Sequence, residues 1–366
     1  MLAFRYIALH YLKYFLVILG ALVLFLVGFD FMDKADQVSR SANIMLIYLV
    51  YKTFFAIDML LPLSLIFAMI TTKIFLIRSN ALVSFYSLGY SRTDILKPFV
   101  VVSTIIIVIF ISLHNLPKFS RADEFSKNIR LHSQYLHPSR DLFFTYEDKY
   151  VYFSKLLPLT NEAEDIRVFS IEGKSLKEVI VAKRAIYKDD AWHIKNADLL
   201  IKPDDMSFSS PGMLVKEEKD LKILHGFKPK MLDQIYEGKV NFTILDALEA
   251  YALLKKQGVE TSSIKGALYK IFIYPFFVPS LVVIIFFFVP MSVRFLNVSL
   301  FSFAAILSTL LVWGVLFMLI EMSTNKTIPS EVGIIGPVFI LFSIAIRQWY
   351  VHHLTSKSPS KDECST

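Results

Sequence analysis

Few residues of this chain have the types and spacings of a catalytic, nucleotide-binding or metal-binding motif. The run Gly173-Lys174-Ser175 is similar to the end of a phosphate-binding loop, but Val168 stands where the first glycine of that motif belongs. There is no Gly-x-Ser-x-Gly turn, no His-Glu-x-x-His pair and only one cysteine, Cys364. His352-His353 could bind a metal ion, but two adjacent histidines in a polar tail are more often simply solvated. We therefore expect no enzymatic activity, no bound cofactor and no metal site.

Six long apolar stretches surround a polar middle region. Three precede residue 117 and three follow residue 266, and a helix needs ~20 such residues to cross the hydrocarbon of a membrane. Hydrophobic residues make up 55% of the chain and charged residues only 19%, which is typical of a protein with several membrane spans. We expect crossings at residues 14–31, 44–77, 98–113, 268–293, 298–320 and 332–350. The sequence thus predicts an α-helical polytopic membrane protein with six transmembrane helices and a large insert.

The second stretch, residues 44–77, is too long for a single crossing. Lys52 and Asp58 fall in its first half, so we expect that half to lie outside the membrane or on its surface. Pro62 is expected to kink the helix near the entry point.

Ionisable residues are scarce in and around the spans. They are Asp30, Asp33, Asp58, Lys73 and Glu321. All five are expected near span ends, where a charge costs less than at the centre of the membrane. This placement argues against a proton relay through the membrane.

Basic residues gather at one set of span ends, and six crossings put both termini on the same side. That side holds Arg5, Lys13, Lys73, Arg78, Arg92, Lys97, Arg294, Arg347, Lys357 and Lys361, and the opposite ends hold only Lys34, Arg40, Lys52, Lys270 and Lys326. The positive-inside rule therefore places both termini in the cytoplasm and the middle domain outside. Acidic and basic side chains nearly balance in residues 117–266, so we expect no nucleic-acid partner.

The middle domain reads as mostly β. Strands are expected at residues 142–146, 150–153, 165–171, 178–187 and 192–201. Residues 147–149 and Asp189-Asp190 are the expected hairpin turns, and Gly173 ends the third strand. Short strands with polar turns every dozen residues indicate a sandwich or jelly roll.

A helix is expected to close the domain. Thr243 and Asp246 form a pair like a capping box, and Gly258 is placed to end the helix. Leu245, Leu248, Tyr251, Ala252 and Leu254 would share one face. That face would pack on the membrane or on the sheet.

The segment between spans two and three, residues 78–89, predicts a short helix. Ser79 would cap it, Gly89 would end it, and Ser91 with Asp94 would cap the next helix. Its exposed apolar residues would be Leu82, Phe85 and Tyr86. Two interpretations stand equally: the helix docks in a groove of a soluble protein, or it lies in the membrane interface with its apolar side in lipid.

The chain resembles the LptF/LptG permeases of the lipopolysaccharide-export ABC transporter over nearly its full length. The three-plus-three layout around a β-rich insert carries the resemblance. So do several local motifs: Leu61-Pro62-Leu63-Ser64-Leu65, Arg78-Ser79-x-x-Leu82-Val83 with Gly89 and Ser91, the run 245–258 before Lys270 and Pro275, and Val289-Pro290-Met291-Ser292. Each motif is weak alone, but their order and spacing together are fairly specific.

The resemblance implies a division of the chain and a set of partners. Residues 1–116 would hold spans one to three, residues 117–266 a periplasmic β-jelly roll, residues 267–350 spans four to six, and residues 351–366 a cytoplasmic tail. Two such permeases would form a heterodimer in the bacterial inner membrane on two copies of a cytoplasmic ATPase, and this chain would bind no nucleotide. Lipopolysaccharide would enter between span one of one permease and span five of the other. It would leave through the jelly roll toward a periplasmic bridge, with a single-span accessory protein as a further partner.

The resemblance also implies two sets of site residues. The coupling helix that contacts the ATPase would use Arg78, Ser79, Asn80, Leu82, Val83, Phe85, Tyr86 and Gly89. The lipid path would use Phe25, Phe29, Met32, Lys34, Phe317, Glu321, Phe144 and Tyr152, with the last two facing the interior of the jelly roll.

The chain departs from the family pattern at two places. Asn80 stands where the coupling helix usually has Glu, so a salt bridge to the ATPase would be missing or supplied elsewhere. The outer end of span one reads Asp30-Phe31-Met32-Asp33-Lys34, where only Lys34 keeps the positive charge that contacts lipid phosphates in the G-type member. Ile328-Pro329, before span six, weakly favours the G-type. The sequence does not distinguish the F-type from the G-type.

One alternative function belongs to a different class. The chain could be a mechanotransmitting subunit that couples an ATPase to an external enzyme without moving lipid. A lipid-sized path from spans one and five into the β domain would favour transport, and a filled domain core would favour signalling. A membrane-bound hydrolase is a more distant alternative.

Overall fold

A computed structural model describes residues 2–38, 42–131, 139–146, 149–157, 161–172, 175–203, 213–226, 243–256, 261–288, 297–325 and 327–357. The chain divides into two compact units. A helical unit comprises Met1–Lys127 and Lys265–Thr366, and a β unit comprises Asn128–Ile264. The run Gly173-Lys174, Gly258 and residues 289–293, on which parts of the sequence interpretation rested, lie outside the described residues.

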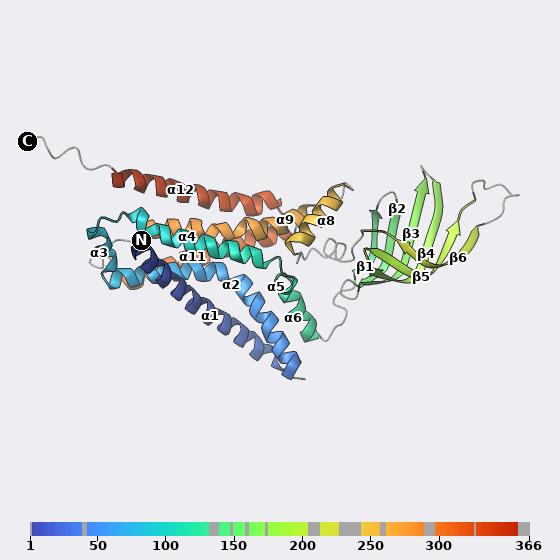
Figure 1. The fold of residues 1–366 in the computed structure, drawn as a ribbon, viewed down its shortest axis with the longest axis horizontal. Coiled ribbons are helices and arrows are strands. Elements are labelled where there is room, and N and C mark those ends of the chain that lie inside the picture. The colour runs from blue at the N-terminus through green and yellow to red at the C-terminus, as the bar shows by residue number, and fades with distance from the viewer. Residues whose placement is uncertain are drawn as a thin grey trace, which may run out of the picture. The chain divides into compact units, whose positions relative to one another are not determined.

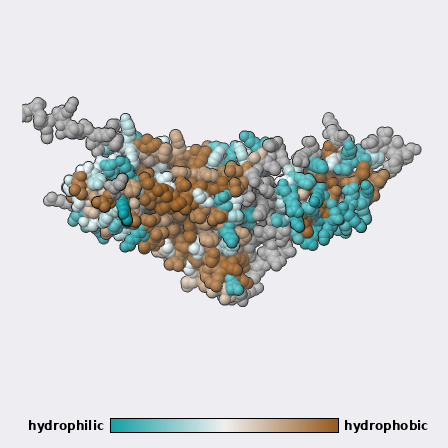
Figure 2. All heavy atoms as spheres, viewed as in Figure 1, coloured by the Kyte–Doolittle hydropathy of each residue, from teal (hydrophilic) through white to brown (hydrophobic). Residues whose placement is uncertain are grey.

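The helical unit holds six helices long and apolar enough to cross a membrane (Figure 1). The predicted polytopic architecture is therefore confirmed. In chain order its elements are α1 (Leu2–Val38), α2 (Ala42–Arg78), α3 (Ala81–Ser87), α4 (Arg92–Leu113), α5 (Pro117–Ser120), α6 (Ala122–Leu131, which runs on past the unit boundary), α9 (Ser262–Phe272), η1 (Tyr274–Phe276), α10 (Phe277–Phe288), α11 (Val298–Thr324), η3 (Glu331–Ile335) and α12 (Gly336–Lys357). Apolar surface covers much of this unit in Figure 2, as expected for a protein surrounded by lipid.

Helix α2 is the central element of the helical unit. It is one continuous helix of 37 residues, contains Pro62 and changes direction along its length (Figure 1). A proline removes one backbone hydrogen bond and clashes with the preceding turn, which explains such a bend. Most of α2 is buried, whereas only about a fifth of α1, α11 and α12 is buried. The exposed helices are the ones available to lipid or to another subunit.

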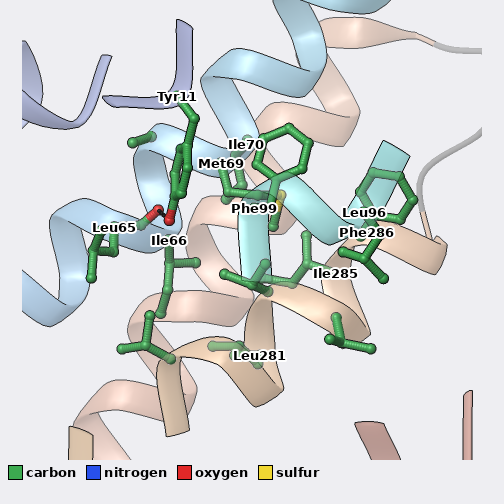
Figure 3. Packing of buried hydrophobic residues seen from close by; sticks show 14 of the residues in the cluster. Tyr11, Leu65, Ile66, Met69, Ile70, Leu96, Phe99, Leu281, Ile285 and Phe286 are labelled. Atoms are coloured by element: carbon green, nitrogen blue, oxygen red, sulfur yellow. Dashed lines mark hydrogen bonds between the residues drawn. The ribbon is translucent and has the colours of Figure 1, made fainter. Parts of the chain in front are cut away.

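The core of the helical unit joins α1, α2, α4 and α10 (Figure 3). Tyr11 of α1, Leu65 of α2, Phe99 of α4 and Phe286 of α10 are all buried in one apolar cluster. The Tyr11 hydroxyl donates a hydrogen bond to the Leu65 carbonyl oxygen, 3.1 Å away, so its polar atom is satisfied inside the cluster. The rings of Tyr11 and Phe99 lie 5.2 Å apart between centroids. These contacts fix the N-terminal part of α1 against α2 and α4.

Two expected spans are not single regular helices. The fourth is broken into α9 and α10 by the turn η1, which contains Pro275. The sixth begins as the π-helical segment η3 before α12. A Cβ at Gly333 of η3 would lie 3.1 Å from the Leu319 carbonyl oxygen of α11. The absence of a side chain therefore lets η3 approach the backbone of α11 closely.

The β unit is built on a six-stranded antiparallel sheet. The strands are β1 (Ser139–Tyr146), β2 (Lys149–Leu157), β3 (Glu162–Glu172), β4 (Ser175–Lys188), β5 (Ala191–Ile201) and β6 (Leu214–Ile223), and they pair in the order of the sequence. Both predicted hairpins are present, with Tyr146 opposite Lys149 and Lys188 opposite Ala191. The described strands form a meander, so the crossover connection of a jelly roll is not among them. Strand β6 was missed, because its sequence is dominated by charged residues.

The β unit has a packed apolar core. Val151 and Phe153 of β2, Ile166 of β3 and Trp192 of β5 are buried at 0 to 1% exposure, and the rings of Phe153 and Trp192 lie 5.2 Å apart. Side chains alternate between the two faces of a strand, so Tyr152 lies on the face opposite to Val151 and Phe153. The expectation that Tyr152 points into the interior is therefore wrong.

Helix α8 (Ile244–Lys256) follows the sheet as predicted. Ala247 is buried, but Leu245 and Leu248 of the predicted apolar face are exposed. Within the described residues, Leu245 and Leu248 are therefore not covered by the chain itself.

Candidate functional site

The short helix α3 connects α2, the most buried span, to α4. Its N-terminal cap is Asn80, in the left-handed conformation with φ 56°, and no side chain caps the helix. The predicted Ser79 cap is wrong, because the Ser79 hydroxyl donates to the Phe75 carbonyl oxygen at 2.8 Å instead. Gly89, at φ +84°, follows the helix in the conformation that glycine adopts most readily.

The start of α4 is capped as the sequence predicted. The Asp94 backbone N–H donates to the Ser91 hydroxyl at 3.1 Å, and the Ser91 N–H donates to the Asp94 carboxylate at 3.2 Å. Lys97 also donates to this carboxylate, at 2.7 Å. The reciprocal cap fixes the point at which the chain turns from α3 into α4.

The apolar residues of α3 divide between the protein interior and solvent in an unexpected way. Leu82 is fully buried in the core of the helical unit, and Phe85 is half-buried against Tyr6 and Tyr90, with ring centroids 6.1 and 6.0 Å apart. Tyr86 is also half-buried, and burial raises the pKa of its phenol. The expectation that Leu82, Phe85 and Tyr86 are the exposed anchors is therefore wrong.

A different stripe of α3 is exposed. It consists of Asn80, Val83, Ser84, Ser87 and Leu88, with Arg78 and Ser79 beside it. Val83 is 49% exposed and Leu88 is 73% exposed. Positions 80, 83, 84, 87 and 88 recur at helical spacing, so they lie on one side of the helix. We call this surface the α3 stripe.

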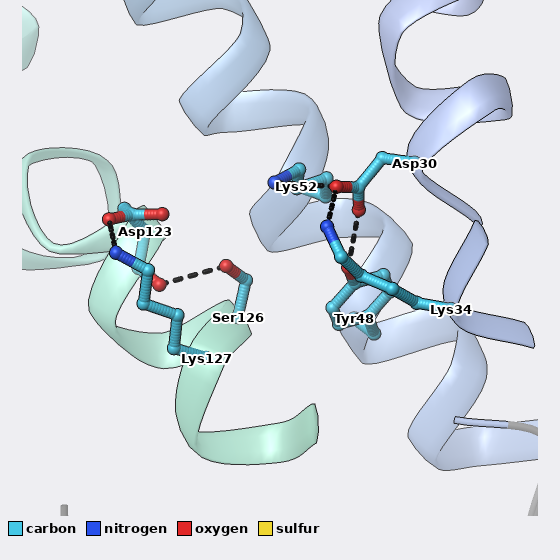
Figure 4. Close-up of polar contacts among 7 residues, drawn as sticks. All are labelled: Asp30, Lys34, Tyr48, Lys52, Asp123, Ser126 and Lys127. Carbon is cyan, nitrogen blue, oxygen red and sulfur yellow. Dashed lines mark hydrogen bonds and ion pairs between the residues drawn. The ribbon is translucent and has the colours of Figure 1, made fainter. Parts of the chain in front are cut away.

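A cluster of charges joins the C-terminal half of α1 to the first half of α2 (Figure 4). The Asp30 carboxylate lies between Lys34 of α1 and Tyr48 and Lys52 of α2. Lys34 donates to one carboxylate oxygen, Lys52 lies 3.1 Å from the same oxygen, and the Tyr48 hydroxyl donates to the other at 2.5 Å. We call these four residues the Asp30 cluster.

The Asp30 cluster holds two cations for one anion. The side chains of Asp30, Lys52 and Lys34 are 12%, 11% and 21% exposed. The charged groups are therefore mostly buried, but each keeps some surface that a ligand can contact. Lys52 also lies over the ring of Phe55, 4.7 Å from its centroid. Along α1, the neighbouring Phe25, Phe29 and Met32 are 70 to 79% exposed. Two ammonium groups thus adjoin an exposed apolar surface, on a stretch of α1 that also carries Asp33 and Asp36.

The sequence pointed to part of this cluster only. Asp30 and Lys34 are four residues apart on one helix, a spacing that predicts a contact. Tyr48 and Lys52 are also four apart, but their approach to Asp30 depends on how α1 packs on α2. No pattern in the sequence specified that packing.

The segment after α4 lies along one face of α2. His114 pairs with Asp58 at 3.0 Å, Phe119 of α5 contacts Phe54 with centroids 6.1 Å apart, and Phe125 of α6 contacts Tyr51 at 5.0 Å. The three α2 positions 58, 54 and 51 recur at helical spacing. The chain that leads toward the β unit is therefore attached to α2 at three successive levels.

The expected site residues of α11 and the β unit lie in different surroundings. Phe317 is 40% exposed and stacks on Trp313, and Glu321 is exposed. Phe144 stands opposite Val151 in the β1–β2 register. The Tyr152 hydroxyl donates to the Asp141 carboxylate at 2.6 Å, which raises the pKa of the phenol, and Arg167 lies over its ring. The Tyr152 hydroxyl is thus held by a polar contact, on the face that also carries the exposed Phe143, its partner in the β1–β2 register.

Two sequence interpretations concerning ionisable residues change. Lys73 is not at a solvated span end: it is 3% exposed and donates to the Phe286 carbonyl oxygen. His352 is not in a free tail, because α12 continues to Lys357 and the His352 ring stacks on Phe287 with centroids 4.3 Å apart. Among the described residues, no group of three His, Cys, Asp or Glu side chains could hold a metal ion.

The fold and these surfaces define a multi-pass inner-membrane protein with a β domain inserted between its third and fourth spans. The family model described as lipopolysaccharide export system permease LptF/LptG matches residues 5–350. The chain therefore belongs to this family, whose members are permeases of the lipopolysaccharide-export ABC transporter. The comparison with curated proteins found no match.

Proposed function

We propose that this chain is one of two permease subunits that extract lipopolysaccharide from the inner membrane and pass it through its β domain to a periplasmic bridge. A cytoplasmic ATPase supplies the energy, and both termini lie in the cytoplasm, where the basic residues gather. The observation that carries the proposal, beyond membership of the family, is the α3 stripe. A short helix between α2 and α4 is anchored by Leu82 in the core and by the capped start of α4, and it still exposes Val83 and Leu88.

The α3 stripe fits the role of the surface that contacts the ATPase. Leu82 anchors the helix in the protein core, so a push on Val83 or Leu88 is transmitted to α2 and α4 and is not absorbed by a loose loop. Because position 80 is Asn, the α3 stripe has no carboxylate, and the exposed Arg78 beside it gives this surface a positive charge. The complementary groove is therefore expected to offer apolar and acidic groups.

The lipid path is proposed to begin at the exposed side of α1. Phe25 and Phe29 stack on each other with centroids 6.3 Å apart, and both are exposed, as is Phe317 on α11. The partner permease would contribute the second wall of each gate. Lys34 of the Asp30 cluster lies within five residues of Phe29, where an anionic headgroup would arrive together with its acyl chains.

Substitutions in the α3 stripe test this function. In the full complex, Leu88→Asp should bury an unpaired carboxylate in the groove, at a cost of about 2–5 kcal/mol, and should abolish co-purification of the ATPase and release of lipopolysaccharide. The matched control is Leu116→Asp, since Leu116 is also exposed but lies at the opposite end of α4. Unchanged recovery of the ATPase with Leu88→Asp would assign α3 to the membrane interface.

One observation favours the mechanotransmitting alternative. The core of the β unit is filled by side chains as large as Phe153 and Trp192, as expected for a domain that transmits movement and does not shelter acyl chains. Under this alternative, the complex would hydrolyse ATP without releasing lipopolysaccharide. Release measured from proteoliposomes therefore separates the two functions.

A further inference from the structure

The Asp30 cluster offers an inference that rests on the proposed function and goes beyond it. Both ammonium groups nearest the proposed lipid entry are already bound by one carboxylate of the same chain. A phosphate group that approached Lys34 would meet a cation whose counter-ion is Asp30. Binding would therefore be an exchange of anions and not a simple addition.

We propose that Asp30 is a built-in competitor that sets how tightly this site holds an anionic lipid headgroup, and that Lys52 of α2 supplies the second cation of the site. When a phosphate monoester is bound, it replaces Asp30 as the partner of Lys34 and Lys52. When Asp30 returns, it displaces the phosphate. The carboxylate thus lowers the affinity and speeds the release of the headgroup.

Three features of the cluster support this assignment. The cluster itself holds two ammonium groups on one carboxylate, so a phosphate that displaces Asp30 meets two cations. The lysines reach Asp30 from two different helices, so a change in the α1–α2 packing alters the competition directly. The Tyr48 hydroxyl holds the second carboxylate oxygen and gives Asp30 a fixed position to return to.

A purely structural role for Asp30 makes the opposite prediction. If the carboxylate serves only to hold Lys34 and Lys52 in place, its removal should scatter the cations and weaken anion binding. If it competes, its removal should free both cations and strengthen binding. The sign of the change therefore decides between the two roles.

The experiment uses the whole transporter complex in nanodiscs. The probes are bis-phosphorylated lipid A and its dephosphorylated form, and the measurements are Kd and the dissociation rate. Asp30→Asn should tighten binding of the phosphorylated probe about tenfold and slow its dissociation, with little change for the dephosphorylated probe. Lys52→Met should weaken binding of the phosphorylated probe. The matched control is Asp33→Asn, which removes an equal charge from an exposed position three residues away.

Several outcomes would overturn the inference. Weaker binding by Asp30→Asn would make Asp30 a structural residue, and equal effects of Asp30→Asn and Asp33→Asn would reduce its role to long-range charge. Competition by millimolar inorganic phosphate as effective as that by lipid A would indicate a general anion site.

If the wild-type complex hydrolyses ATP but binds both probes equally, the proposed lipid site itself fails. If the wild type prefers the phosphorylated probe and Asp30→Asn matches it, only the competitor role fails.

Discussion

The ammonium group of Lys73 binds Phe286 in two ways at once. It donates a hydrogen bond to the Phe286 carbonyl oxygen and lies 3.7 Å from the centroid of the Phe286 ring. Phe286 is in the last turn of α10, where backbone carbonyl groups have no partner within the helix. Lys73 lies five residues before the end of α2, next to the segment that leads into α3. It therefore ties the end of α10 to the region that we propose receives the ATPase.

Removal of this lysine should loosen the end of the bundle where α2 and α10 meet beside α3. Lys73→Met keeps the volume of the side chain but leaves the Phe286 carbonyl oxygen buried without its donor, at a cost of about 1–3 kcal/mol. We expect a lower Tm of the detergent-purified complex and a reduced yield of lipid release per ATP hydrolysed. Lys97→Met, on the exposed side of α4, is the control. An unchanged Tm and an unchanged coupling ratio would show that the contact has no mechanical role.

A methyl group at Gly333 should disturb the start of the last span. The new Cβ would lie 2.9 Å from Ile328 Cδ1 and 3.1 Å from the Leu319 carbonyl oxygen, and a backbone oxygen cannot move aside easily. Gly333→Ala should therefore destabilise the protein by about 1–3 kcal/mol. Gly314→Ala in α11 is the matched control, because its Cβ would meet no atom within 4 Å and alanine favours a helix. Thermal unfolding that ranks the two variants equally would contradict the packing of η3 on α11.

The contacts between α2 and the segment after α4 should matter for transmission. Phe119→Ala removes a buried ring between Phe54 and His114, and large-to-small changes of this kind typically cost about 3–5 kcal/mol in a full core. We expect the variant to assemble with its ATPase but to release less lipopolysaccharide for each ATP hydrolysed. Release and hydrolysis that fall together would instead indicate general misfolding.

Photo-crosslinking tests the proposed path of the lipid. A crosslinking residue at Phe29 should label with lipopolysaccharide before ATP is added, and one at Phe144 should label only during hydrolysis. The buried Phe99 provides a control position that should never label. Labelling at Phe29 alone would mean that the lipid enters but leaves by another route.

The sequence predicted the parts of this protein that depend on local patterns. The aromatic run 142–146 and the Asp189-Asp190 turn were sufficient to locate two hairpins, because alternation and turn residues act over a few positions. The cap formed by Ser91 and Asp94 was found for the same reason. Contacts between separate helices could not be predicted, because they depend on how the helices pack and not on a local pattern. Leu82 is buried in the core and Val83 is exposed, but nothing in the surrounding sequence predicts this difference.

The charged clusters illustrate the same limit. Lys52 and Asp30 are far apart in the sequence, and their pairing follows from the register of α1 against α2, which many apolar contacts decide together. Strand β6 escaped prediction because its exposed charged residues hide the alternation that marks a strand. Helix α3 is too short for its periodicity to reveal which side is buried.

The lengths of α1 and α2 have a consequence for the energy of extraction. A helix of 37 residues is ~55 Å long, and the hydrocarbon of a membrane is only ~30 Å thick. The pair is longer than the hydrocarbon is thick, and its end around the Asp30 cluster also carries exposed apolar side chains such as Met32 and Leu46. An acyl chain exposed to water loses ~0.8 kcal/mol of favourable burial for each CH₂ group. A lipid that moves along this surface would exchange contacts with the bilayer for contacts with the protein, one methylene at a time. The free-energy barrier to extraction would then be divided into many small steps.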